Sequence, residues 1–230
     1  MEKLIKIKRA LISVSDKTGI VELAKELCGR NIELVSTGGS ASILRDAGFK
    51  VTEVSKLTGF PEMMDGRLKT LHPNVHGGLL ADRDKKSHVN AMEKYNVKEI
   101  DLLVVNLYPF AQTVRAEADY AQCIENIDIG GPAMIRAAAK NFKYVATLVD
   151  IEDYEGLVNE LKMNNGCTSY SFRQKLSQNA FSLSAYYDAM VSNWMLDNIT
   201  GVNPRRFSIS AALSQDLRYG ENPHQSASFF

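Results

Sequence analysis

The most restrictive feature of this sequence is an alternation of short apolar segments with amphipathic segments of helical period. Residues 10–14 form an apolar, β-favouring run, and residues 20–28 then place apolar side chains every three or four positions. The same unit follows at residues 32–35 and 40–47, where Gly48 ends the second helix. Strands that alternate with helices favour a parallel sheet covered by helices on both faces. The chain is therefore predicted to fold as an α/β domain.

Three further strands are predicted downstream. Residues 51–54 and 145–149 are candidate strands, and residues 102–105 are four consecutive apolar side chains, which leave no polar face and indicate a buried strand. A helix is expected from about residue 152 to residue 162. A long amphipathic helix is expected over residues 171–198, because its apolar residues recur every three or four positions.

Composition excludes several classes of protein. The 230 residues are 45% hydrophobic and 23% charged, as in globular chains, and 27 basic residues balance 27 acidic ones. This balance argues against a general nucleic-acid or membrane-surface binder. The sequence shows neither a membrane span nor a signal-peptide pattern, and its three separated cysteines suggest neither disulfides nor a metal knuckle. We therefore expect a cytoplasmic protein without nucleic-acid or membrane partners.

The loops after the first two predicted strands carry the first candidate binding residues. In a parallel sheet, ligands bind beyond the carboxyl ends of the strands. One loop contains Ser13 and Lys17, and the other contains Ser36, Thr37 and Gly39. Hydroxyl and backbone N–H groups at helix N-termini favour a phosphate, although such residues are also ordinary helix caps. The sequence has no G-x-G-x-x-G and no P-loop motif, which disfavours a dinucleotide or P-loop site.

A second group of candidates lies in the segment DGRLKTLHP, residues 65–73. If this segment is extended, Arg67 and Lys69 project from the same side and suit an anion; a solvated charged turn is the alternative. His72 and His76 are close in sequence, but without a third ligand at a recognisable spacing they do not predict a metal site. We expect an anion contact here and no bound metal.

A third group follows the buried strand. Tyr108 stands just past the strand end, where its ring can face a ligand cleft or cap the core. Further on, residues 126–141 read NIDIGGPAMIRAAAKN, in which Pro132 suits the first position of a helix. The preceding glycines then leave N–H groups at the helix start, where they can bind a phosphate or a developing oxyanion. Lys140 shares a helix face with Arg136, which is equally typical of a solvated surface.

Together, the segments SVSDKTG, STGGS, DGRLKTLHP, NLYPF and IDIGGPAMIRAAAKN, followed by LRYGENPHQ, resemble the N-terminal part of the AICAR transformylase/IMP cyclohydrolase family of bifunctional purine-biosynthesis enzymes. The resemblance runs from about residue 9 to residue 225. It implies a three-layer α/β fold similar to methylglyoxal synthase over residues 1–200, with a parallel sheet flanked by helices and a long C-terminal helix. Residues 201–230 would be a linker and the irregular start of a transformylase domain.

The resemblance also implies a reaction and roles for residues. The cyclohydrolase half closes the formylated aminoimidazole carboxamide ribotide (FAICAR) to inosine monophosphate (IMP) with loss of water. Asp128 would be the base toward the carboxamide nitrogen, and Tyr108 and Lys140 would donate protons or stabilise charge, with Lys69 completing the catalytic set. N–H groups near Ile129 and Gly130 would form the oxyanion hole. The implied contacts to phosphate, ribose or base are Ser13, Lys17, Ser36, Thr37, Gly39, Arg67, Thr70, Asn106, Ile129 and Gly130.

One geometric question accompanies these roles. Asp128 and Lys140 are twelve residues apart, a separation of about 18 Å along a straight helix. They meet only if the turn at Gly130 and Gly131 folds Asp128 back along the helix. Otherwise the two residues reach the ligand from different directions, or one role is misassigned.

The resemblance further implies partners. No cofactor is expected for the cyclohydrolase reaction, and 10-formyltetrahydrofolate belongs to the transformylase half, whose opening motif at residues 218–225 lies close to the end of this chain. We therefore expect a truncated or split-gene form without transformylase activity, and a homodimer in the full-length family. Two alternatives stay open: a phosphate- or nucleotide-sensing domain without catalysis, and a lyase similar to methylglyoxal synthase.

Overall fold

The computed structural model describes residues 3–64, 66–201, 203–222 and 224–230. Asp65 and Pro223, which belong to two of the motifs above, lie outside the described residues. The chain gathers into two compact units, Met1–Phe181 and Ser182–Phe230. The limit between them falls inside a long helix, whereas the domain limit expected from the resemblance follows residue 200 and stays a prediction.

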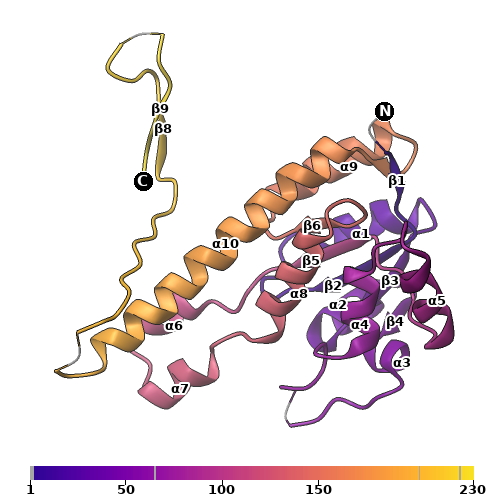
Figure 1. The fold of residues 1–230 in the computed structure, drawn as a ribbon, viewed down its shortest axis with the longest axis horizontal. Coiled ribbons are helices and arrows are strands. Elements are labelled where there is room, and N and C mark those ends of the chain that lie inside the picture. Colours follow the sequence, from indigo (N-terminus) through magenta and orange to yellow (C-terminus); the bar gives the residue numbers. More distant parts are fainter. Residues whose placement is uncertain (1–2, 65, 202, 223) are drawn as a thin grey trace. The chain divides into compact units, whose positions relative to one another are not determined.

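The first unit is built on a five-stranded parallel sheet in the order β4-β3-β2-β5-β6 (Figure 1). The order reverses at β2, whose neighbours are β3 and β5, so the carboxyl end of β2 marks the crevice where doubly wound sheets bind ligands. All five strands were predicted with limits that differ by at most one residue. They are β2 (Arg9–Ser13), β3 (Glu33–Ser36), β4 (Val51–Glu53), β5 (Leu102–Val105) and β6 (Ala146–Leu148).

The helices of this unit are of two kinds, those that the sequence predicted and those that it missed. The predicted ones are α1 (Ile20–Cys28), α2 (Gly38–Asp46), α8 (Gly130–Lys140), α9 (Asp153–Met163) and the long α10 (Tyr170–Asp197), which begins in this unit. The missed ones are α3 (Val54–Thr58), α4 (Pro73–Leu80), α5 (Lys86–Lys94), α6 (Phe110–Arg115) and α7 (Tyr120–Glu125).

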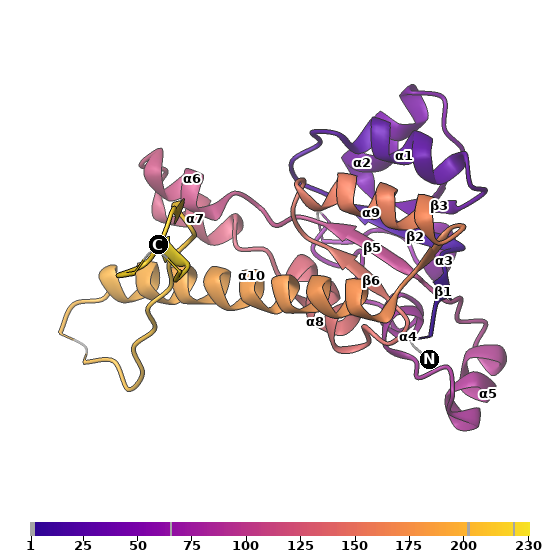
Figure 2. The same ribbon diagram turned by 90° about the horizontal axis from the view of Figure 1, so that it is seen from above.

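Helices cover both faces of the sheet. Figure 2 shows α1, α2 and α9 on one side of the strands and α4 and α8 on the other. On the first side, Ile12 of β2 and Val104 of β5 belong to one buried cluster with Leu23 of α1. The neighbouring strand residues Leu11 and Leu103 point to the opposite face and are also buried. The sheet is therefore buried on both faces, as the run of apolar residues in β5 predicted.

Two smaller strand pairs lie outside this sheet. In the first unit, β1 (Ile5–Lys6) pairs antiparallel with β7 (Cys167–Thr168). In the second unit, β8 (Gln215–Leu217) pairs antiparallel with β9 (Ala227–Phe229), where the sequence indicated an irregular arm with a strand at its end. No helix in the described ranges is both long and apolar enough to span a membrane.

Candidate active site

The loops after β2 and β3 meet at the carboxyl edge of the sheet, as the sequence predicted. The hydroxyl oxygens of Ser13 and Thr37 are 3.0 Å apart and share a hydrogen bond. The Ser36 hydroxyl is buried and donates to the carbonyl of Ile12 at 2.7 Å, which ties β3 to β2. Ser13 therefore contacts Thr37 at this end of the sheet, and the Ser36 hydroxyl has an internal partner.

Lys17 lies beside the start of α2. A Cβ on Gly39 would be 3.9 Å from the Lys17 Cε atom. The ammonium group donates to the carbonyls of Ser15, at 2.8 Å, and of Val14. Partial burial lowers the pKa of Lys17, and the neighbouring charge of Asp16 opposes this shift. Lys17, the predicted phosphate contact, is thus near the helix start, and its ammonium group donates hydrogen bonds to carbonyls of its own loop.

Asn106, which follows β5, forms hydrogen bonds with the loop after β2. Its Oδ1 atom accepts hydrogen bonds from the N–H groups of Ser15 and Asp16, and its Nδ2 atom donates to the Asp16 carbonyl at 3.0 Å. Both ends of the amide are therefore engaged by the loop after β2. We assign this side chain to holding the loop in place, a role that the sequence did not indicate.

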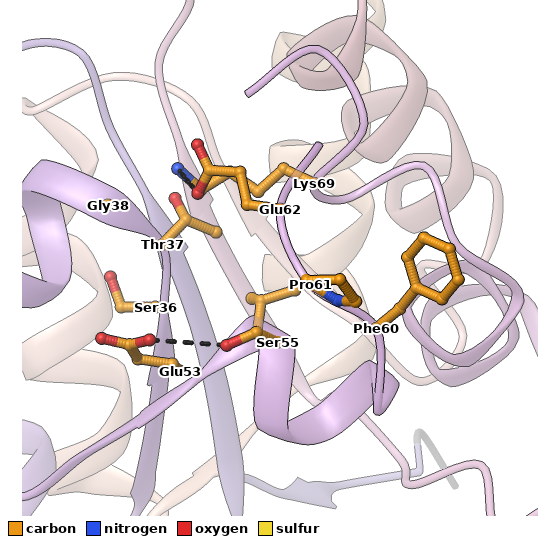
Figure 3. A pocket seen from close by; sticks show the side chains of 10 residues that line it. Ser36, Thr37, Gly38, Glu53, Ser55, Phe60, Pro61, Glu62 and Lys69 are labelled. Atoms are coloured by element: carbon orange, nitrogen blue, oxygen red, sulfur yellow. Dashed lines mark hydrogen bonds and ion pairs between the residues drawn. The ribbon is translucent and has the colours of Figure 1, made fainter. Parts of the chain in front are cut away.

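Lys69 lies directly over the start of α2 (Figure 3). A Cβ on Gly38 would be only 2.6 Å from the Lys69 Nζ atom, and the φ angle of +41° at Gly38 also favours glycine. Within the described part of the chain, the side chain of Thr37 does not cap this helix. The positive helix end and the ammonium group both favour an anion at this place.

A pocket opens beside Lys69, between the turn that joins β3 to α2 and the segment after β4. Figure 3 shows Thr37, Glu62 and Lys69 in its upper part and Ser36 and Glu53 in its lower part. The sequence interpretation missed six of the ten lining residues, although an aromatic and an acidic residue shortly before a basic motif were a usable signal. The lining residues that it missed are Glu53, Val54, Ser55, Phe60, Pro61 and Glu62.

The motifs at residues 65–73 and 127–141 meet where Thr70 contacts the start of α8. The Thr70 side chain is buried, and a Cβ on Gly130 would be 2.9 Å from its Oγ1 atom. A Cβ on Gly131 would be 2.5 Å from the Asp128 Oδ2 atom. These close approaches require glycine at both positions. The sequence predicted Pro132 as the first residue of this helix. The helix begins at Gly130, so Pro132 is its third residue and the prediction was wrong by two positions.

Asp128 and Tyr108 are two neighbouring acidic groups of the site whose pKa values are both raised. The Gly131 N–H donates to Asp128 Oδ1 at 2.8 Å. Burial raises the pKa of Asp128, and hydrogen bonds from the backbone of Gly131 and Tyr108 offset part of this shift. Burial also raises the pKa of the Tyr108 phenol, and the negative charges of Asp128, Glu62 and Glu125 raise it further. Two interacting groups with shifted pKa values are typical of a catalytic site.

Arg67 and Lys69 contact different carboxylates. Arg67 is exposed and pairs with Glu125 at the end of α7, whereas Lys69 pairs with Glu62 at 2.9 Å. Met63 and Leu68 form an antiparallel bridge, and the Arg67 N–H donates to the Met64 carbonyl. Arg67 therefore lies in a turn and not in the expected extended segment, and of these two cations Lys69 is the one that lines the pocket.

Lys140 lies away from this cluster. It is the last residue of α8 and is exposed, about 15 Å along the helix from Gly130. Because α8 connects the parallel strands β5 and β6, it runs against them and ends at the opposite edge of the sheet. The Asp128 carboxylate accepts a hydrogen bond from the first turn of α8. Asp128 therefore stays at the start of the helix and is not folded back along it toward Lys140. The exposed Ile129 precedes the helix at the site edge.

His72 has a structural role. His72 Nδ1 accepts a hydrogen bond from the Asn74 N–H at 3.1 Å and so caps α4. The His72 ring also lies 6.2 Å, between centroids, from the ring of Phe60, which lines the pocket. Over the ranges that the structure covers, no group of three or more His, Cys, Asp or Glu side chains is arranged to hold a metal ion.

The parallel sheet with anion-suited loops at its carboxyl edge defines the chain as an α/β domain of the MGS-like class. The family model for the MGS-like domain matches residues 19–133. The family model described as the AICARFT/IMPCHase bienzyme matches residues 138–230. Both halves of the chain thus match families that the sequence motifs had indicated.

Individual relatives agree with these matches. The chain is 61% identical over its full length to the bifunctional purine biosynthesis protein PurH of Dinoroseobacter shibae and 59% identical to that of Ruegeria pomeroyi, and it spans 44% of each. The crystal structure of ForH is 36% identical, with a TM-score of 0.73, and the match covers 82% of this chain and 99% of that one. The chain therefore belongs to the PurH family and corresponds to its N-terminal, MGS-like part.

Proposed function

We propose that this chain is an IMP cyclohydrolase, which closes FAICAR to IMP with loss of water. The observation that carries the proposal is the meeting of two features at one edge of the sheet. One is the anion-suited start of α2 beneath Lys69, and the other is the carboxyl of Asp128 beside the phenol of Tyr108. The purine-biosynthesis names of the relatives support the same reaction.

The chemistry assigns a role to each group. The carboxamide nitrogen of the substrate attacks the formyl carbon, so a proton leaves the nitrogen and the formyl oxygen gains negative charge. Asp128 accepts the proton, and its raised pKa makes it a stronger base than an exposed aspartate. Tyr108, whose raised pKa keeps it protonated, gives its proton to the formyl oxygen as the ring closes. Asp128 then passes the proton it accepted to the resulting hydroxyl group, which leaves as water, and the proton of the former formamide nitrogen restores the Tyr108 phenol. Lys69 stabilises an anionic oxygen of the ribonucleotide.

The remaining assignments follow from the family and are part of the proposal. The ring closure uses no cofactor, and 10-formyltetrahydrofolate serves only the transformylase reaction of the longer relatives. A homodimer and a cytoplasmic location are proposed on the same ground. Lys140 was assigned to proton transfer by resemblance, and its position at the far end of α8 gives that role no geometric support.

The test is incubation of the purified chain with FAICAR while formation of the purine ring is followed by ultraviolet absorbance. We expect turnover by the chain alone, with IMP as the product. Binding of IMP without product formation would favour a sensing domain. Release of methylglyoxal and phosphate from dihydroxyacetone phosphate would favour a lyase, so the same preparation separates the three activities.

A further inference from the structure

The pocket holds a carboxylate where an anion of the substrate is expected. Glu62 Oε2 is 2.9 Å from Lys69 Nζ. The other oxygen of Glu62, Oε1, lies against Gly66, where an added Cβ would be 2.8 Å from it. The Lys69 side chain is 24% exposed and that of Glu62 is 48% exposed, so the pair is covered on the lysine side and open on the glutamate side.

This ion pair offsets an electrostatic conflict at the start of α2. The Lys69 ammonium group lies against Gly38, the first residue of the helix, where the helix dipole is positive. A cation at this end is unfavourable unless an anion lies beside it. In the ligand-free chain Glu62 provides that negative charge, and Figure 3 shows its carboxylate at Lys69 on the pocket wall.

We propose that Glu62 is a tethered counter-ion, which occupies the anion position at Lys69 and yields it to an anionic oxygen of the substrate. The inference rests on the proposed function, since it takes a ribonucleotide monophosphate as the ligand. Binding is then an exchange of one anion for another. The Arg67 and Glu125 pair is similar but largely exposed on both sides, so Glu62 is the stronger competitor.

The exchange makes a prediction about affinity. Glu62→Gln removes the competing charge and keeps the shape of the side chain. We expect the variant to bind IMP roughly two- to fivefold more tightly at low ionic strength, a ratio that corresponds to about 0.4 to 1 kcal/mol for a partly exposed ion pair. The gain should disappear when Lys69→Ala is also present, because the two charges act through one contact.

Isothermal titration calorimetry with IMP measures this effect, and Glu26→Gln is the matched control. Glu26 pairs with Arg30 at 2.7 Å with side-chain exposures of 39% and 21%, close to the values for Glu62 and Lys69, but it lies on α1 outside the site. The control should bind IMP like the parent chain.

The possible outcomes separate the counter-ion role of Glu62 from the proposed function. Weaker binding by Glu62→Gln would mean that Glu62 positions Lys69 for the ligand, and it would overturn the counter-ion role. Equal affinity in the parent and in Glu62→Gln would also overturn it, while the proposed function would stand. A parent chain that binds no IMP would instead overturn the proposed function itself.

Discussion

The two edges of the parallel sheet use charged side chains in opposite ways. At the amino edge, Asp101 precedes β5 and is 1% exposed. One of its oxygens accepts the N–H groups of Lys8 and Arg9 at 2.8 and 3.0 Å, and the other accepts the Arg83 guanidinium at 2.7 Å. This carboxylate is bound permanently by groups of the chain itself.

At the carboxyl edge, charged groups pair with exposed partners. Lys69 and Arg67 pair with the exposed carboxylates of Glu62 and Glu125. Asp128 has a raised pKa, so the folded chain favours its neutral form more than water does. The comparison indicates that a buried, fully bonded charge marks the scaffold, whereas an exchangeable one marks the site.

The largest effect is expected at the amino edge. Asp101→Ala leaves the Arg83 guanidinium and two backbone N–H groups without their carboxylate, and breaking a buried pair costs about 3–5 kcal/mol of unfolding free energy. Urea denaturation followed by circular dichroism measures the loss. Glu99→Gln is the control, because Glu99 lies 3.5 Å from the same Arg83 but is 43% exposed, and it should cost less than about 1 kcal/mol. Equal losses in both variants would contradict the division between the edges.

At the carboxyl edge, the next largest effect concerns turnover. Asp128→Asn should reduce the rate of FAICAR closure at least about a hundredfold, because the amide cannot act as the base. Its affinity for IMP should change little, since the amide oxygen still accepts the Gly131 N–H. Asp119→Asn is the matched control, because Asp119 likewise accepts the N–H of the residue three positions on, Gln122, at 2.8 Å, and lies outside the site. A parental rate in Asp128→Asn would remove Asp128 from the mechanism.

The strands and the helices differ in how well the sequence predicted them. The strands were predictable because runs such as residues 102–105 are apolar throughout, which only a doubly covered sheet explains. α5 was missed because it has few apolar residues, and among its described residues none is buried. In α4, Gly78 packs against the carbonyl of Lys98, and this close contact removes the side chain that would have marked the helix face.

Within the site, the sequence predicted the positions of three of its four catalytic candidates at one end of the sheet, with Lys140 the exception, but not what each one binds. The family motifs and the strand-end rule placed Lys69, Tyr108 and Asp128 at the carboxyl edge. That Asn106 holds the backbone of the loop after β2, and that Glu62 pairs with Lys69, depends on contacts between segments that turn toward each other only in the fold. Such pairings have no local sequence pattern.

A smaller effect is expected on affinity. Lys69→Ala removes a charge-assisted contact and should weaken IMP binding by about 1.5–3 kcal/mol, as measured by calorimetry. Lys140→Ala removes the same charge at the opposite edge of the sheet and should leave the dissociation constant unchanged. A loss of affinity in Lys140→Ala equal to that in Lys69→Ala would show that the two lysines reach one ligand, against the arrangement of α8.

The smallest effect concerns stability and its dependence on pH at Asp128. Because burial raises its pKa, the folded chain keeps the Asp128 proton to a higher pH than the unfolded chain does. Between the ordinary carboxyl pKa and the raised one, the folded state binds more protons, so stability falls as the pH rises through this window. Asp128→Asn removes the ionisation and should be more stable than the parent at about pH 7, by less than about 1 kcal/mol, with a smaller difference at about pH 3.

Urea midpoints of parent and Asp128→Asn at both pH values measure this difference. A variant that is less stable than the parent at about pH 7 would mean that the fold prefers the ionised carboxylate. Asp128 would then resemble Asp101, a charge retained for the scaffold, and the contrast between the two edges would rest on the exchangeable pairs of Lys69 and Arg67 alone. A stabilised variant would instead show that the ionised carboxylate of Asp128 destabilises the folded chain. A carboxylate whose ionised form is destabilised by the fold takes up a proton readily, as a catalytic base must.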